Sequence, residues 1–95
     1  MENTYEGIFK INDVDVKARV ISITPTNNSL GRWYGSGDIE NLNSEKYVML
    51  TNEMIKSPSH KTTIGSIIVN RVSPEGEGNI HIEFTGSGKF LGFEK

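Results

Sequence analysis

Hydrophobic and polar residues alternate along several short segments of the chain, which predicts β-strands. The clearest example covers residues 79–85, where Ile80, Ile82 and Phe84 are separated by single polar residues. Residues 14–20 show the same period of two. Alternate side chains of a strand point to opposite faces, so each segment is predicted to bury one face in a core and expose the other.

Turn-forming residues divide the chain into six predicted strands, which cover residues 5–11, 14–24, 32–39, 46–51, 62–72 and 79–85. The predicted connections are a turn at Asn12-Asp13, a loop at 25–31, a polar link at 40–45 and a Gly/Pro turn at 73–78. Two segments fit two different structures each. Residues 51–60 form one helical turn or a wide hairpin loop, and Phe90–Phe93 is a short last strand or a docked tail.

The alternation changes phase once within the second predicted strand. Apolar residues occupy even positions as far as Val20 and then odd positions at Ile21 and Ile23. A slip of one residue in a period-2 pattern predicts a β-bulge or a strand that changes sheets.

The predicted strands follow one another closely, without a crossover helix, so we expect an antiparallel sheet. Short, bent antiparallel strands around one core tend to close, because closure protects their edges. The predicted fold class is all-β: a small closed or nearly closed antiparallel barrel of about six strands, SH3-like or Greek-key, in a single domain over residues 1–95. An open β-sandwich is the alternative.

Composition strengthens the all-β prediction. Val and Ile contribute 17 of the 95 residues, whereas Leu contributes four and Ala one. β-Branched residues suit a pleated sheet, while helical proteins rely on Ala and Leu, so a helical bundle is excluded. The net charge of −2 is spread along the chain, without the basic excess typical of dedicated nucleic-acid binders.

Several absences restrict the class of protein. The chain has no cysteine, which excludes a disulfide framework or a Cys-based zinc site and favours a reducing compartment. The first residues are polar and acidic, unlike a signal peptide, and the longest apolar runs have three or four residues. We therefore expect a cytoplasmic protein without membrane association.

The sequence offers no catalytic or metal-binding constellation. His60 is predicted in a loop and His81 on a solvent-facing strand surface, with no carboxylate spaced to orient either ring. No nucleophile elbow, phosphate-binding loop or dinucleotide motif is present. The expectation is a non-enzymatic protein without cofactor or metal.

The segment Arg32–Gly37 is the most distinctive part of the sequence. Its aromatic pair, Trp33-Tyr34, followed by Gly35-Ser36-Gly37, fits a base- or anion-binding loop. The structural interpretation is preferred: Trp33 fills the core, Tyr34 faces solvent and the glycines allow a bulge. Gly86-Ser87-Gly88 repeats the Gly-Ser-Gly motif of residues 35–37. We expect the two motifs to lie at independent strand ends rather than side by side.

Three motifs give the chain a resemblance to short, uncharacterised bacterial all-β proteins. The motifs are Trp33-Tyr34-Gly35, Gly65-Ser66-Ile67-Ile68-Val69 and Phe84-Thr85-Gly86-Ser87-Gly88. The chain departs from that pattern over Lys56–Thr63, which lacks an Asp-Gly-Arg turn. The resemblance implies a small bacterial barrel and no particular function.

The leading functional prediction is a binding module that engages a protein partner. The candidate binding residues are outward polar or aromatic side chains near predicted strand ends: Arg32, Tyr34, Arg71, His81 and Lys89. The alternative is a single-stranded nucleic-acid binder that stacks bases on exposed aromatics. Its residues are Tyr34, Tyr47 and Phe90 with Arg32, Arg71 and Lys89. A small ligand bound inside the barrel is the second alternative.

Overall fold

The computed structural model describes residues 2–23 and 32–93 and contains six strands and one helix among them. The elements are β1 (Glu2–Ile11), β2 (Val14–Ile23), β3 (Arg32–Ile39), α1 (Ser44–Lys56), β4 (Ser59–Thr62), β5 (Gly65–Gly76) and β6 (Asn79–Ser87). The predicted loop at 25–31 and the end of the second predicted strand, Thr24, lie outside the described residues.

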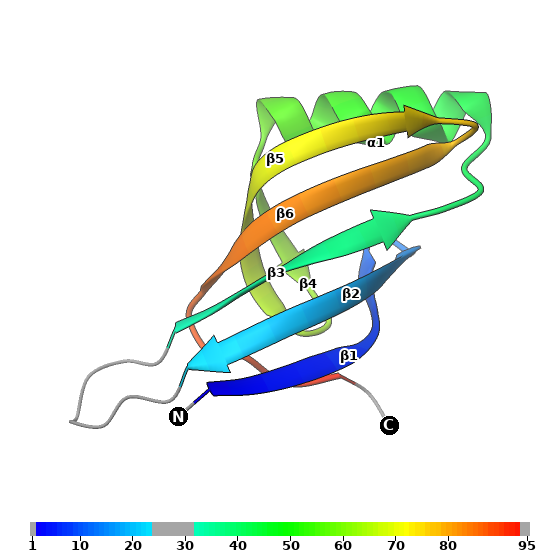
Figure 1. The fold of residues 1–95 in the computed structure, drawn as a ribbon. Coiled ribbons are helices and arrows are strands. Elements are labelled where there is room, and N and C mark those ends of the chain that lie inside the picture. Colours follow the sequence, from blue (N-terminus) through cyan, green and yellow to red (C-terminus); the bar gives the residue numbers. More distant parts are fainter. Residues whose placement is uncertain (1, 24–31, 94–95) are drawn as a thin grey trace.

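All strands form one antiparallel sheet in the order β1-β2-β3-β6-β5-β4 (Figure 1). The sheet curls into a half-barrel, and its two edges meet at one point. There the backbone N–H of Lys10 at the end of β1 donates to Thr63 Oγ1 in the turn between β4 and β5, at 3.1 Å. The prediction of a small, nearly closed antiparallel β fold is confirmed.

The inner face of the half-barrel holds the core. Alternate residues of each strand point inward and are almost completely buried, for example Val16, Val20, Ile80, Ile82 and Phe84. The predicted inward faces of residues 14–20 and 79–85 are therefore confirmed.

The helix α1 contradicts the strand predicted at residues 46–51 and the expected absence of a crossover helix. Asn43 caps the helix, because its side-chain oxygen accepts the Lys46 backbone N–H at 2.8 Å. Leu50 and Met54 lie one turn apart and are buried against the inner face of the sheet. The four-residue apolar run 47–50 was misread as a strand because so short a run fits a buried strand or helix equally well.

Residues 51–56 take the helical form of the two predicted for 51–60, as the last part of α1, which ends at Lys56 before Pro58. The remainder differs from both forms, because β4 follows after Pro58 as a short edge strand. Of the predicted strand 62–72, Thr62 is the end of β4 and residues 65–72 belong to β5, with a tight turn at Thr63 and Ile64 between them. In Figure 1 the helix runs behind β5 and β6 at the top of the molecule.

The two Gly-Ser-Gly motifs lie on neighbouring strands but not side by side as a pair, because residues 35–37 stand opposite residues 82–84 and not opposite residues 86–88. β3 and β6 are neighbours, with Gly35 opposite Phe84. A Cβ on Gly86 would collide with the ring of Trp33, so the indole packs directly on that glycine. The core position preferred for Trp33 is confirmed, since it is 3% exposed and its Nε1 donates to the Gly88 carbonyl at 2.8 Å.

The irregularities in strand pairing occur at other positions than the predicted bulges. β2 pairs with β1 and with β3 in unbroken register through Ile21 and Ile23, so these two residues simply face outward. Gly35 is in regular register too; a side chain there would collide with the Arg19 carbonyl. The irregularities lie in β5, between Val69 and Arg71 and between Pro74 and Gly76.

The segment after β6 is a docked tail, the second of its two predicted forms. Leu91 donates its backbone N–H to the Ile64 carbonyl at 2.8 Å. The ring of Phe90 lies 5.1 Å from that of Trp33, and Phe93 packs on Gly7 of β1. The tail therefore crosses from β6 to β1 on the inner side of the sheet.

Candidate functional site

Four of the five candidate binding residues lie on the outer face of the half-barrel. Arg32 and Tyr34 belong to β3 and His81 to β6, where they alternate with inward-facing neighbours, and Arg71 follows the irregularity in β5. They are spread over about 20 Å along the strands rather than gathered in one pocket. Lys89, the fifth, is exposed in the tail after β6 and does not belong to this face.

A mostly apolar row of side chains crosses the middle of the outer face, and its one polar member, Thr85, accepts a hydrogen bond from Asn70 Nδ2 at 2.6 Å. The row consists of Ile21, Tyr34, Thr85 and Ile68, which are direct cross-strand neighbours on β2, β3, β6 and β5. Tyr34 and Ile68 are 41% and 42% exposed. Neighbouring strands lie about 4.8 Å apart, so this outer row is continuous over about 14 Å. The sequence indicated only Tyr34, because the register that aligns the others is not readable from one strand.

The outer row continues at one end of the face. Ile23 is 37% exposed and stands two residues from Ile21 on the same side of β2. Its cross-strand partners are Glu2 of β1 and Arg32, the first residue of β3. At this corner the apolar side chains are therefore bordered by one acidic and one basic residue.

Charged residues border the outer row on its other side, and two basic side chains there each pair with a carboxylate. Arg71 Nη1 lies 3.7 Å from Glu83 Oε2, and Lys17 Nζ lies 3.1 Å from Glu40 Oε1. These exposed pairs contribute little to stability, but they leave the bordering surface without a net charge.

His81 also has an acidic partner, contrary to the expectation that no carboxylate orients it. Its Nδ1 lies 2.7 Å from Asp38 Oδ1. The two residues are directly paired across β3 and β6 but stand 43 positions apart in the sequence. Only the strand register brings them together, so no local motif could indicate the contact.

The other histidine was misplaced by the sequence prediction. His60 lies on the inward side of β4 opposite Ile67 and is 9% exposed, not in an exposed loop. Its Nε2 is buried and has no hydrogen-bond partner among the described residues. The ring is therefore an inert part of the core rather than an accessible ligand.

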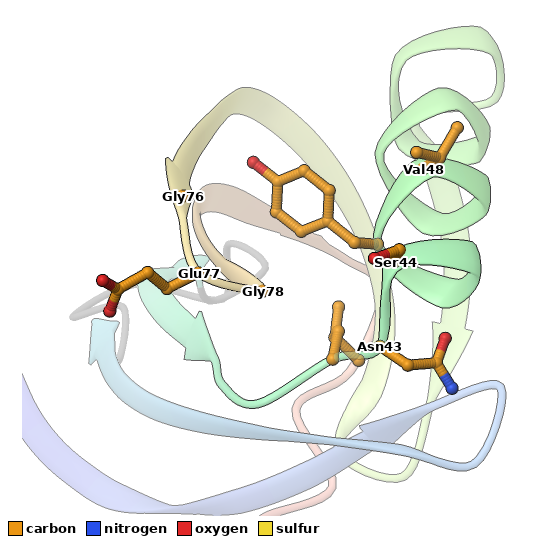
Figure 2. Close-up of a pocket in the computed structure, with 8 residues that line it drawn as sticks. Asn43, Ser44, Val48, Gly76, Glu77 and Gly78 are labelled. Atoms are coloured by element: carbon orange, nitrogen blue, oxygen red, sulfur yellow. The ribbon is translucent and has the colours of Figure 1, made fainter.

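Two hollows interrupt the surface. One of about 390 Å³ lies on the outer face beside the outer row, where the small side chain of Ser36 stands between longer neighbours such as Arg19. The other, of about 610 Å³, lies between the start of α1 and the turn from β5 to β6 (Figure 2).

The hollow beside α1 offers few free polar groups. Asn43 uses its side-chain oxygen to cap the helix, and the Leu42 backbone N–H donates to the Gly78 carbonyl at 3.0 Å. Figure 2 shows the side chain of Glu77 extending away from the helix. The close approach of two backbone segments shapes this hollow, because a Cβ on Gly78 would collide with the Leu42 carbonyl.

Exposed apolar residues also occur on α1. Val48, Met49 and Ile55 are 55–65% exposed. Val48 and Ile55 are seven residues apart and lie on the same side of the helix, separated by about 10 Å, while Met49 points about 100° away from Val48. The outer row of the sheet is the more continuous apolar surface.

Within residues 2–23 and 32–93, no group of three or more His, Asp or Glu residues is placed to hold a metal ion. No helix of that part is long and apolar enough to cross a membrane. Comparison of the chain with protein-family models, curated proteins and solved structures gives no significant match. The function is therefore argued from the outer face alone.

Proposed function

We propose that the protein is a non-enzymatic binding module whose outer sheet face engages a protein partner. The observation that carries the proposal is the outer row, in which Tyr34 and Ile68 remain exposed at the centre of a broad, charge-balanced surface. Aromatic and apolar residues surrounded by a polar rim are typical of protein interfaces.

The adjoining hollow supports the same assignment. It opens between β1, β2 and β3 next to Ser36, and it is large enough to receive one side chain of a partner. Interfaces concentrate their binding energy where an anchor side chain fills such a pocket. The Tyr34 ring can insert into a pocket of the partner, and the hollow can accept a side chain of the partner.

Charge and placement favour protein over single-stranded nucleic acid. Nucleic-acid binding relies on uncompensated cations, whereas Lys10, Lys17, Arg19 and Arg71 each lie within 4 Å of a carboxylate. The aromatic residues expected to stack bases are also dispersed. Tyr47 belongs to α1 and is half-buried, and Phe90 packs against Trp33 in the tail.

Site-specific photo-crosslinking in cells tests the proposal. Benzoylphenylalanine is introduced at Tyr34 or Ile68 on the outer row and, as a matched control, at the exposed Met49 on α1. We expect the two sheet positions to crosslink the same protein, and the helix position to give no such product.

Two results would contradict the proposal. One is a crosslink at Tyr34 that nuclease treatment removes, which assigns nucleic acid as the partner. The other is an equal yield of the same product from Met49, which places the contact on the helix.

A further inference from the structure

The two edges of the sheet differ in a way that points to a second interaction surface. β4, at one edge, has only four residues, a common means of limiting strand pairing with other chains. β1, at the other edge, has ten residues and contains no proline. Residues 2–8 of β1 are exposed apart from Gly7, which is half-buried.

The unpaired backbone groups of β1 belong to its even-numbered residues. Lys10 directs its backbone N–H away from β2, toward Thr63 Oγ1. In an antiparallel pair the residues alternate between facing the partner strand and facing away. Glu2, Thr4, Glu6 and Ile8 therefore present their N–H and C=O groups outward, and no described residue bonds to them.

The side chains along this edge define what fits it. On the outer face the even positions carry two carboxylates, Glu2 and Glu6, and then Ile8, which is 53% exposed. The cation nearest Glu6 is Arg19, whose Nε is 3.9 Å away, and Glu2 has no ion pair among the described residues. The edge is thus acidic at one end and apolar at the other.

We propose that β1 binds an extended basic segment of a partner protein as an added antiparallel strand. The partner's lysine or arginine residues lie opposite Glu2 and Glu6, and a β-branched apolar residue lies opposite Ile8. Backbone hydrogen bonds to the four even positions hold the strand, as in other complexes formed by strand addition. The Lys10–Thr63 contact closes the edge beyond Ile8, so the segment has about seven residues.

A second copy of the chain fits this edge less well. Antiparallel pairing of two β1 edges through all four free positions places Glu2 opposite Ile8 and Glu6 opposite Thr4 of the other copy, so neither carboxylate faces a cation of the added strand and the two Glu6 side chains are diagonal neighbours. Like charges on neighbouring strands are destabilising. The occupant is therefore a foreign basic strand. This inference concerns the edge, and it does not depend on the proposal for the outer face.

Titration with synthetic seven-residue peptides, followed by amide chemical shifts of the full chain, tests the proposal. One peptide carries lysine opposite Glu2 and Glu6 and valine opposite Ile8, and its control carries glutamate at both lysine positions. We expect shifts confined to β1 and β2, and at least about tenfold weaker binding of the acidic peptide.

Backbone chemistry provides a test that leaves the protein unchanged. N-methylation of the peptide amides that face β1 is expected to abolish binding, and N-methylation of the alternate amides to preserve it. On the protein, Ile8→Pro removes an outward N–H, which edge strands tolerate, and is expected to weaken binding about tenfold or more. Tyr34→Thr, on the outer row, is expected to change this affinity less than twofold.

Four results would overturn the proposal. Three are equal affinity for the lysine and glutamate peptides, an equal loss of affinity from both patterns of N-methylation, and dimerisation of the peptide-free chain through β1. Loss of peptide binding in Tyr34→Thr together with an unaffected Ile8→Pro would likewise place the peptide on the outer row.

Discussion

Trp33 and Tyr34 are neighbours in β3, yet one lies on each face of the sheet, and the two faces differ in exposure and in packing. Trp33 is 3% exposed and packs on Gly86, while Tyr34 is 41% exposed and its ring has no packing partner among the described aromatic residues. The side chains of the inner face are closely packed. The outer row, in contrast, stays exposed and makes no contribution to the core.

The comparison teaches where stability and function are located. Close packing makes inner residues intolerant of change, because voids and collisions both cost free energy. An exposed apolar row adds little to the free energy of unfolding and is open to a partner. Substitutions on the two faces should therefore separate stability from binding.

The largest effect is expected from removing the indole on the inner face. Trp33→Ala deletes a buried aromatic side chain and leaves a cavity beside Phe84 and Phe90, at a cost of about 4 kcal/mol in the free energy of unfolding. Urea unfolding followed by circular dichroism measures the loss. A cost below about 1 kcal/mol would contradict the assignment of Trp33 to the core.

The contact between Trp33 and Gly86 is expected to show the next largest effect. Gly86→Ala places a methyl group into the indole ring and should cost about 2 to 3 kcal/mol. The same change in the Trp33→Ala background should cost much less, because the obstacle is gone. A double-mutant cycle measures this coupling. Additive losses in the free energy of unfolding would show that Gly86 is not required for its contact with Trp33.

A smaller change of opposite sign is expected at His60. Its buried Nε2 lacks a partner, so His60→Leu should raise the free energy of unfolding by about 1 kcal/mol. The adjacent Lys61 faces outward and is exposed, so Lys61→Leu is the matched control and should change stability by less than about 0.5 kcal/mol. Destabilisation by His60→Leu would indicate that the imidazole makes a necessary contact.

The smallest effect on stability is expected on the outer row. Tyr34→Thr replaces an exposed aromatic residue by a β-branched one, which also suits a strand, and should change the free energy of unfolding by less than about 0.5 kcal/mol. Thermal unfolding of both variants compares this change with the loss of stability in Trp33→Ala. A loss close to that of Trp33→Ala would remove the distinction between the two faces.

The sequence predicted the parts of the fold that depend on local alternation. The inward faces of β2 and β6 follow from single strands, because a period of two is visible within seven residues. The helix was missed over residues 44–50, because its buried residues, Leu50 and Met54, are few, and the run before Leu50 is uninterrupted. The capping side chain of Asn43 was the one local indication of a helix start that went unused.

The candidate site was predictable only in part, since it depends on strand register. Tyr34 could be placed outward from its position beside Trp33, but its alignment with Ile21 and Ile68 requires the order of four strands. The contact between His81 and Asp38 required the same information. The exposed edge of β1 depends on the global arrangement, because no strand reveals from its own residues whether it lies at an edge.

The affinity for the protein that crosslinks at Tyr34 tests the central claim most directly. With Tyr34 and Ile68 both changed to threonine, the account predicts at least about tenfold weaker binding, because aromatic anchors dominate interface energies. Met49→Thr on α1 should change the dissociation constant less than twofold. Unchanged binding by the outer-row variant, or an equal loss from Met49→Thr, would contradict the account.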